Sequence, residues 1–176
     1  MALSMPMAGA PAPEVDDVEI KMALFLPRDA ASVPVSRQVL DSCLETLGVT
    51  PDTRTDIALA LGEACANVVL HAGPGVEYEV LASARDGRCV IEVVNTVPSA
   101  VDRDEAPVPA GTALGSPSPE PVPATAEHGR GLKIIDAVTD NLQLTGDGRA
   151  GTTVHFEKAL SWVPGAAGEQ LLSAHS

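Results

Sequence analysis

The sequence predicts an α+β domain, a two-layer α/β sandwich in which a mixed, mostly antiparallel sheet carries helices on one face. First, strand-like runs with alternating apolar residues come mostly in pairs joined by short turns. Second, only a few segments space their apolar residues as helices do. Third, 176 residues suffice for one domain with a substantial core, which must be mainly aliphatic because only 2% of the residues are aromatic. Few helices beside paired strands favour this layered arrangement.

The charge of the chain restricts its partners. Lysine and arginine total 11 against 24 acidic residues, which gives a formal net charge of −13. Nucleic acids and anionic membrane surfaces attract basic proteins, so we expect no direct nucleic acid and no membrane among its partners. A bound anion would have to rely on local donors, such as the N–H groups at a helix N-terminus.

Cysteine usage and the first residues of the chain favour a soluble, cytoplasmic protein. The three cysteines, Cys43, Cys65 and Cys89, lie far apart in apolar segments, so we expect buried thiols rather than disulfides or zinc ligands. No basic residue precedes Lys21 and no sustained apolar run is found there, so we expect no signal peptide. The apolar run that starts at residue 57 is too short and too interrupted by polar residues to span a bilayer.

The first elements are a tail, a strand and a helix. Residues 1–18 are small, acidic and proline-bearing, and we predict a disordered tail. The mixed run 19–26 is predicted to be a strand. Residues 33–47 have helical apolar spacing, and Gly48 suits the left-handed conformation that ends a helix.

A second, longer helix follows, and then a hairpin. Thr50 can cap this helix and Pro51 suits its first turn, while Gly73-Pro74-Gly75 ends it. The run "VEYEVLASA" then places Val76 and every second residue to Ala84 on one face of a strand. Asp86-Gly87 forms the turn to its partner strand "CVIEVVN".

The rest of the predicted domain, which spans residues 19–160, contains a long loop, a helix and a second hairpin. The loop 97–127 carries seven prolines, and a segment of this kind inside a domain is commonly a lid or disordered. "GRGLKIIDAVTDNL" is predicted to be a helix, and "LQLTGDGRAGTTVHFEKA" to be strand, turn, strand. Residues 161–176 are predicted to be a C-terminal tail.

The glycines from Gly146 to Gly151 match the dinucleotide-binding pattern G-x-G-x-x-G letter for letter. That pattern requires a helix after it, whereas "TTVHF" alternates as a strand does. We therefore interpret these glycines as a hairpin turn.

Three polar residues at four-residue spacing, Glu63, Asn67 and His71, form a stripe on the long apolar helix. Glu63 and His71 are about 11–12 Å apart along the axis, too far to share one metal ion. Asn67 offers a neutral oxygen suited to Mg²⁺, and Glu63 could deprotonate a hydroxyl or a water. The alternative is a solvated polar edge on a half-buried helix.

Two further features suit ligand binding, one to phosphate and one to a polar edge. Gly129-Arg130-Gly131 opens a helix, where glycines allow close backbone approach and the N–H groups favour phosphate, and Lys133 adds charge. Asn95 ends a strand, and its amide could read a donor–acceptor edge. Each alone also suits an ordinary loop junction or turn.

In combination and in this order, these segments resemble the GHKL, or Bergerat-fold, ATPases, which have a histidine-kinase-like ATPase fold. "EACANVVLHA" resembles their N-box, "HGRGLKII" their second glycine box, and "GTTVHF" their closing strand. A single small domain without a phosphoacceptor helix pair is most similar to the RsbW-like anti-sigma-factor serine-protein kinases.

The resemblance implies a role for each residue. Glu63 would be the catalytic base toward a serine, and Asn67 would hold Mg²⁺ against ATP. The loop 97–127 would be the ATP lid. The remaining nucleotide contacts implied by the resemblance are His71, Asn95, Gly129, Arg130, Gly131, Leu132, Lys133 and Thr152.

This sequence departs from the family pattern at two places. The first glycine box usually reads Asp-x-Gly-x-Gly, whereas here Asn95 replaces the acid and neither glycine is present. An asparagine oxygen still accepts from the adenine amino group, but without the charge-assisted contact of a carboxylate. The N-box often has a basic residue where this chain has Leu70.

The leading functional prediction is an ATP-binding anti-sigma factor that works by partner switching. Its partners would be a sigma factor, an anti-anti-sigma antagonist that it phosphorylates on serine, and a second copy in a homodimer. The first alternative is a non-catalytic regulatory binding module with a degenerate ATP site. The second is a detached histidine-kinase ATPase domain.

Overall fold

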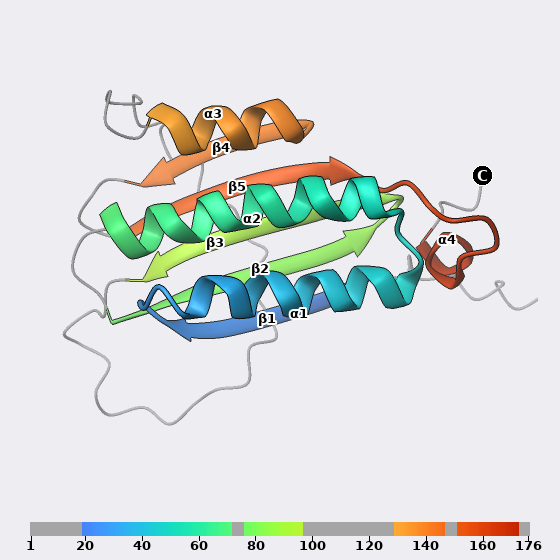
Figure 1. The fold of residues 1–176 in the computed structure, drawn as a ribbon, viewed down its shortest axis with the longest axis horizontal. Coiled ribbons are helices and arrows are strands. Elements are labelled where there is room, and N and C mark those ends of the chain that lie inside the picture. The colour runs from blue at the N-terminus through green and yellow to red at the C-terminus, as the bar shows by residue number, and fades with distance from the viewer. Residues whose placement is uncertain (1–18, 72–75, 97–128, 147–150, 173–176) are drawn as a thin grey trace, which may run out of the picture.

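A computed structural model describes residues 19–71, 76–96, 129–146 and 151–172 of the chain. Its elements form two layers, a sheet and a row of helices lying over one face of it (Figure 1). In chain order they are β1 (Ile20–Pro27), α1 (Ser32–Leu47), α2 (Pro51–His71), β2 (Glu77–Arg85), β3 (Arg88–Thr96), α3 (Gly129–Val138), β4 (Asn141–Gly146), β5 (Gly151–Ala159) and α4 (Ala167–Leu172).

The five strands lie in the order β1-β2-β3-β5-β4, and each described pairing is antiparallel. The prediction of an α+β sandwich is confirmed, but the expectation of a mixed sheet is wrong in this detail. The strands β3 and β4, which precede and follow α3 in the chain, run in the same direction because both pair antiparallel with β5. They are not neighbours, because β5 lies between them and pairs antiparallel with both.

The helix-covered face of the sheet is apolar because alternate residues of each strand point toward it. One cross-strand row illustrates this: Ala82 pairs with Ile91, Ile91 with Phe156, and Phe156 with Leu142. The first three are buried and Leu142 packs against them. Register therefore places apolar side chains of four strands in one layer under the helices.

The helix α2 is the central helix of its layer. It contacts β3 and β5 below it, α1 on one side and α3 on the other (Figure 1). Its sheet-facing residues, which include Ile57, Leu61 and Ala64, are buried. Within the described ranges, no helix combines the length and the apolar character needed to cross a membrane.

The β2–β3 hairpin follows the sequence prediction closely. Asp86 and Gly87 have φ values of 50° and 70°, the left-handed pair that a two-residue hairpin turn requires. Tyr78, Val80 and the following alternate residues of β2 are buried, as predicted. Val76 does not share that face: it precedes β2 and is 74% exposed.

The helix predicted over 129–142 is shorter than expected. It ends at Val138, and Thr139 donates its N–H to Ile135 to close the last turn. Asp140 then donates its N–H to the Glu157 carbonyl, and its side chain accepts the N–H of Ala159. Pairing with β5 satisfies the backbone groups of β4, and its alternating leucines pack against the core, so the chain continues as a strand.

The predicted C-terminal tail over 161–176 is wrong for its described part. α4 packs against α1, and Leu172 is buried. An added Cβ on Gly168 would lie 2.5 Å from the Trp162 ring and 2.6 Å from the Leu47 carbonyl oxygen, so the contact is close. The Leu172 carbonyl also accepts the N–H of Gly87. This segment therefore covers the core at the β2–β3 turn.

The thiols are only partly as predicted. Cys65 and Cys89 are buried, and burial raises the pKa of Cys89 to about 12. Cys43 is exposed, against the expectation, because its side chain lies on the solvent side of α1. Cys65 belongs to a buried polar group in which Ser36 approaches its sulfur at 3.6 Å and the Ser32 and Tyr78 hydroxyls lie 2.7 Å apart. These contacts fix α1 against α2 and β2.

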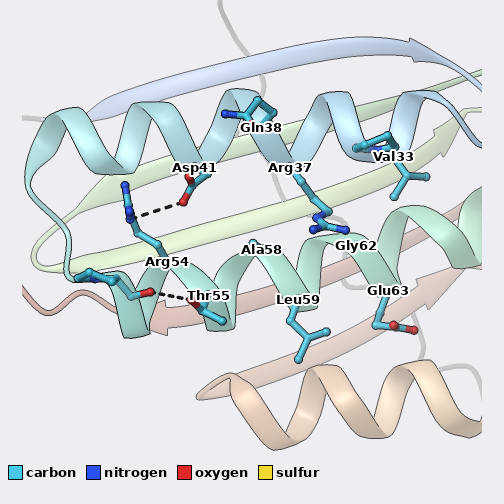
Figure 2. Close-up of a pocket in the computed structure, with 12 residues that line it drawn as sticks. Val33, Arg37, Gln38, Asp41, Arg54, Thr55, Ala58, Leu59, Gly62 and Glu63 are labelled. Atoms are coloured by element: carbon cyan, nitrogen blue, oxygen red, sulfur yellow. Dashed lines mark hydrogen bonds and ion pairs between the residues drawn. The ribbon is translucent and has the colours of Figure 1, made fainter.

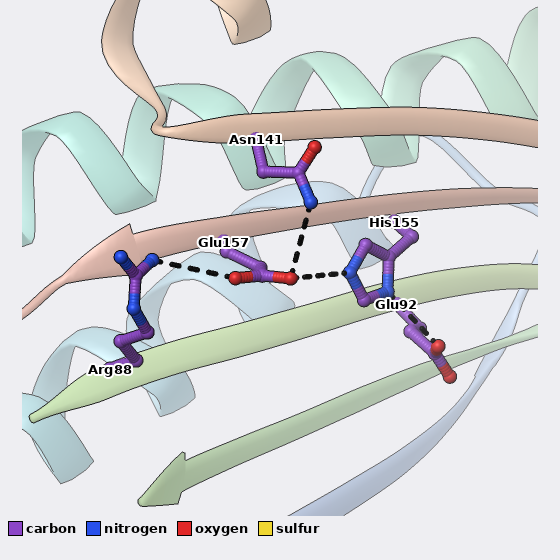
Figure 3. A network of polar contacts seen from close by, with 5 residues as sticks. All are labelled: Arg88, Glu92, Asn141, His155 and Glu157. Atoms are coloured by element: carbon purple, nitrogen blue, oxygen red, sulfur yellow. Dashed lines mark hydrogen bonds and ion pairs between the residues drawn. The ribbon is translucent and has the colours of Figure 1, made fainter. Parts of the chain in front are cut away.

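The opposite face of the sheet carries a polar network. His155 on β5 lies between Glu92 and Glu157, with ring-nitrogen to carboxylate distances of 3.1 and 3.3 Å (Figure 3). Asn141 on β4 donates to Glu157 at 3.2 Å, and Arg88 pairs with the same carboxylate. Hydrogen bonding to Glu92 raises the pKa of His155, and hydrogen bonding to His155 lowers the pKa of Glu92 and of Glu157.

This network is expected to make stability depend on pH. The raised pKa of His155 adds stability that is fully present below 6.5 and is lost as pH rises through the folded-state pKa. The lowered pKa values of Glu92 and Glu157 add stability that is present above 4.5 and is lost as pH falls through their folded-state pKa values. The window of greatest stabilisation is therefore pH 4.5–6.5.

The measurement is thermal unfolding of wild type and His155→Gln at about pH 6 and about pH 9. Wild type should lose more of its melting temperature than the variant over this interval. Equal losses in the two proteins would contradict the assignment.

Candidate nucleotide-binding site

The polar stripe on α2 lies at the border of the core. Glu63 and Asn67 are half-buried, while their neighbours Ala64 and Val68 are fully buried against the sheet. The helix thus packs one side on the sheet and turns its polar stripe toward α3. His71 is the last residue of α2, and its side chain lies outside the described residues.

The first turn of α3 lies directly on this stripe. A Cβ added to Gly131 would lie 3.0 Å from the Glu63 Oε2 atom and 3.5 Å from the Asn67 Oδ1 atom. Any larger residue at 131 would have to displace these side chains. α3 is held in this position by Ile135, which is fully buried, and by Leu132 and Val138, which pack on the core. Two segments more than 60 positions apart in sequence therefore meet at one place.

Asn67 Nδ2 and Asn95 Oδ1, at this end of the sandwich, are buried and have no hydrogen-bond partner among the described residues. Asn95 is only 1% exposed, and Thr152 lies directly opposite it on β5. Buried polar groups are nearly always satisfied, so such atoms indicate a missing ligand or water. A half-turn of either amide exchanges its donor and its acceptor, so Asn67 can present its oxygen to a cation.

The charge at the start of α3 is exposed. Arg130 and Lys133 are both solvent-accessible, and Leu132 is half-buried. Arg130 and Lys133 add positive charge beside the N–H groups of the first turn in a strongly acidic chain. Within the described ranges, no cluster of three His, Cys, Asp or Glu side chains could hold a metal ion. Mg²⁺ on Asn67 would need water and phosphate oxygens as its other ligands.

Lys158 ties the far end of α3 to α2. Its Nζ atom lies 2.7 Å from both the Asp56 carboxylate at the start of α2 and the Val138 carbonyl at the end of α3. The side chain is 18% exposed. A cation at a helix C-terminus also interacts favourably with the helix dipole. Sequence reasoning did not single out Lys158, since nothing in its position along β5 indicates two distant helices.

Replacing Lys158 by methionine is expected to loosen α3 without unfolding the domain. Losing this half-buried contact should cost about 1 kcal/mol and increase amide exchange across α3. Because Gly131 belongs to the same helix, the affinity of the candidate site for a nucleotide should fall several-fold. Lys158→Arg should restore much of it. Lys21→Met, which removes an exposed ion pair with Glu19, is the matched control. Unchanged α3 exchange in Lys158→Met would contradict this role.

A pocket of about 700 Å³ lies over the outer side of α1 and α2 (Figure 2). It shares only Glu63 with the predicted site residues. Arg37 crosses it, and an added Cβ on Gly62 would lie 3.2 Å from the Arg37 Cδ atom. Sequence analysis missed this surface, although a glycine inside a helix can signal a close neighbour of this kind. The pocket and the Gly131 contact therefore meet at Glu63 from two sides.

The comparisons with known proteins agree with this geometry. The sequence pattern of the histidine kinase-like ATPase domain matches residues 26–158. The chain belongs to this family. Membership gives the chain the fold of an ATP-binding, kinase-like domain, and places the α2 stripe and the α3 glycines inside the matched region.

The solved structures include a two-domain chain, part of which has the same fold as this histidine kinase-like ATPase domain. The RsbU and RsbW domains of Rv1364c from Mycobacterium tuberculosis match with a TM-score of 0.58 and 17% identity, over 82% of this chain and 33% of that one. This chain thus spans about a third of that chain's length, and the likeness concerns the fold alone. No curated protein matches the chain significantly.

The structure brings together part of the predicted site. Gly131 meets Glu63 and Asn67, and Asn95 pairs in register with Thr152. The predicted lid over 97–127 lies outside the described residues. The roles assigned to these residues remain predictions. Gly146 ends β4 and Gly151 begins β5, and these two strands pair antiparallel, as expected of a hairpin and not of a Rossmann site.

Proposed function

We propose that this histidine kinase-like ATPase domain is an anti-sigma factor that sequesters a sigma factor and is released by partner switching. In this proposal it phosphorylates a serine of an anti-anti-sigma antagonist with ATP. The observation that carries the proposal is the close approach of Gly131 to Glu63 and Asn67. The RsbW domain named in the similar structure supports the same class of function.

The residues present fit a magnesium nucleotide. Asn67 has a buried amide atom without a partner among the described residues, and any side chain at position 131 would fill the space beside Glu63 and Asn67. The nucleotide supplies the phosphoryl group when bound. The N–H groups of the first α3 turn and Arg130 would hold its phosphates, and Asn67 would hold Mg²⁺. Few other groups are needed, because phosphoryl transfer depends mainly on positioning and charge stabilisation.

Glu63 is the residue proposed to act on the acceptor serine. Its carboxylate lies between the α3 start and the open pocket over α1 and α2, from which a partner's hydroxyl can approach. General-base catalysis of this kind typically contributes about a hundredfold to ten-thousandfold in rate.

The test uses the purified chain, Mg-ATP and antagonist candidates captured from native cells. Acid-stable phosphate on a serine of the partner, lost in Glu63→Gln with ATP binding retained, is the expected result. Glu169→Gln, the same change at an exposed position of α4, should phosphorylate normally. No nucleotide binding at millimolar ATP would defeat the proposal, and acid-labile phosphate would favour a histidine-kinase activity instead.

A non-catalytic binding module is the second candidate. It is favoured by Asn95, which stands where the family usually has a carboxylate. Calorimetry separates the two candidates, because a module of this kind would bind its partner equally well with and without ATP and transfer no phosphate.

A further inference from the structure

Asn95 is the last inward-facing residue of β3. Val93 and Ile91 precede it on the same face, and all three side chains are buried. Its Oδ1 atom has no hydrogen-bond partner among the described residues. An amide in such an apolar setting is costly unless something satisfies it. The position therefore belongs to a ligand-facing wall rather than to the packed core.

The place of Asn95 in the fold supports this interpretation. Figure 1 shows the end of β3, the end of α2 and the start of α3 at the same end of the sandwich. Asn95 pairs in register with Thr152 on β5. Directly opposite residues of an antiparallel pair point to the same face, so the amide and the half-buried hydroxyl lie side by side on the helix-covered face.

Both groups are chemically adaptable. An asparagine amide carries an acceptor and donors, and a half-turn exchanges them, while a threonine hydroxyl donates or accepts. The 6-position of adenine presents an amino donor, and that of guanine presents an acceptor oxygen. A carboxylate at position 95 could accept from adenine but would face the guanine oxygen with a like partial charge. An amide can satisfy either base.

We infer that the nucleotide site accepts both adenine and guanine nucleotides, with Asn95 as the residue that permits it. The inference rests on the proposed nucleotide binding, with the purine base placed against Asn95 and Thr152, and extends it from ATP to GTP. Thr152 adjusts its hydroxyl to the base that is present. The relaxed specificity follows from replacing a group that only accepts by one that can also donate.

The first experiment is calorimetry of the wild-type chain with Mg-ATP and with Mg-GTP. The two dissociation constants are expected to agree within about tenfold, since each base can be satisfied by one amide orientation. Binding of ATP with GTP more than about a hundredfold weaker would overturn the inference and leave the proposed function standing. Binding of neither nucleotide would defeat the proposed function, and this inference with it.

The second experiment uses Asn95→Asp. The carboxylate should raise the ratio of the GTP dissociation constant to the ATP dissociation constant by about tenfold to a hundredfold. The reason is that a carboxylate cannot donate to the guanine oxygen. Gln170→Glu makes the same amide-to-carboxylate change at an exposed position of α4 and should leave the ratio unchanged. Thermal unfolding checks that Asn95→Asp is folded. An unchanged ratio in folded Asn95→Asp would overturn the role of Asn95. If that variant does not fold, the comparison of ATP and GTP binding to wild type tests the inference.

Discussion

Asn67→Ala is expected to abolish Mg-ATP binding while leaving the fold intact. The side chain is half-buried beside Gly131, and its Nδ2 atom has no partner among the described residues. Removing a group that the folded protein does not satisfy costs little, and alanine favours a helix more than asparagine does. The melting temperature should therefore stay the same or rise. Affinity should fall by about a hundredfold or more, since a metal ligand or phosphate donor is lost.

Titration calorimetry with Mg-ATP and thermal unfolding test this together. Asn141→Ala is the matched control, because this amide donates to Glu157 on the opposite face of the sheet. It should lose a little stability and keep its ATP affinity. Unfolding of Asn67→Ala would mean that the side chain supports the core, and unchanged affinity would mean that the site lies elsewhere.

Gly131→Val is expected to have the second large effect. The first added carbon alone would lie 3.0 Å from the Glu63 carboxylate, and the two further methyl groups must displace Glu63 and Asn67. Both are ends of flexible side chains, so they can rotate away without unfolding the domain. They then leave the positions that the proposed site needs. We expect roughly a hundredfold loss in phosphoryl transfer, because small misplacements of reacting groups are costly.

The measurement is serine phosphorylation of the partner together with ATP titration. Ala137→Val adds a β-branched residue at an exposed position of the same helix and controls for lower helix propensity. A fully active Gly131→Val would show that α3 does not need to approach Glu63 so closely.

Local pattern predicted much of the fold. Apolar spacing predicted α1, capping and stop signals predicted α2, the Asp86-Gly87 pair predicted the β2–β3 turn, and alternation predicted the buried face of β2. These features depend on neighbours a few residues apart, so they can be read from the chain itself. The errors arose where distant segments compete. The helix α3 stops at Val138, after which the chain pairs with β5, and α4 packs against α1 and Trp162 through its glycine.

The candidate site divides in the same way. Four-residue spacing by itself placed Glu63 and Asn67 on one stripe of a helix, since helix geometry requires it. The motif resemblance indicated which glycines to expect near them. Tertiary structure alone brought Gly131 to within a side chain's width of that stripe, left the Asn95 amide buried without a described partner, and joined two helix ends through Lys158. Such contacts depend on how the sheet orders its strands and how helices pack on it, and no local pattern in the sequence contains that information.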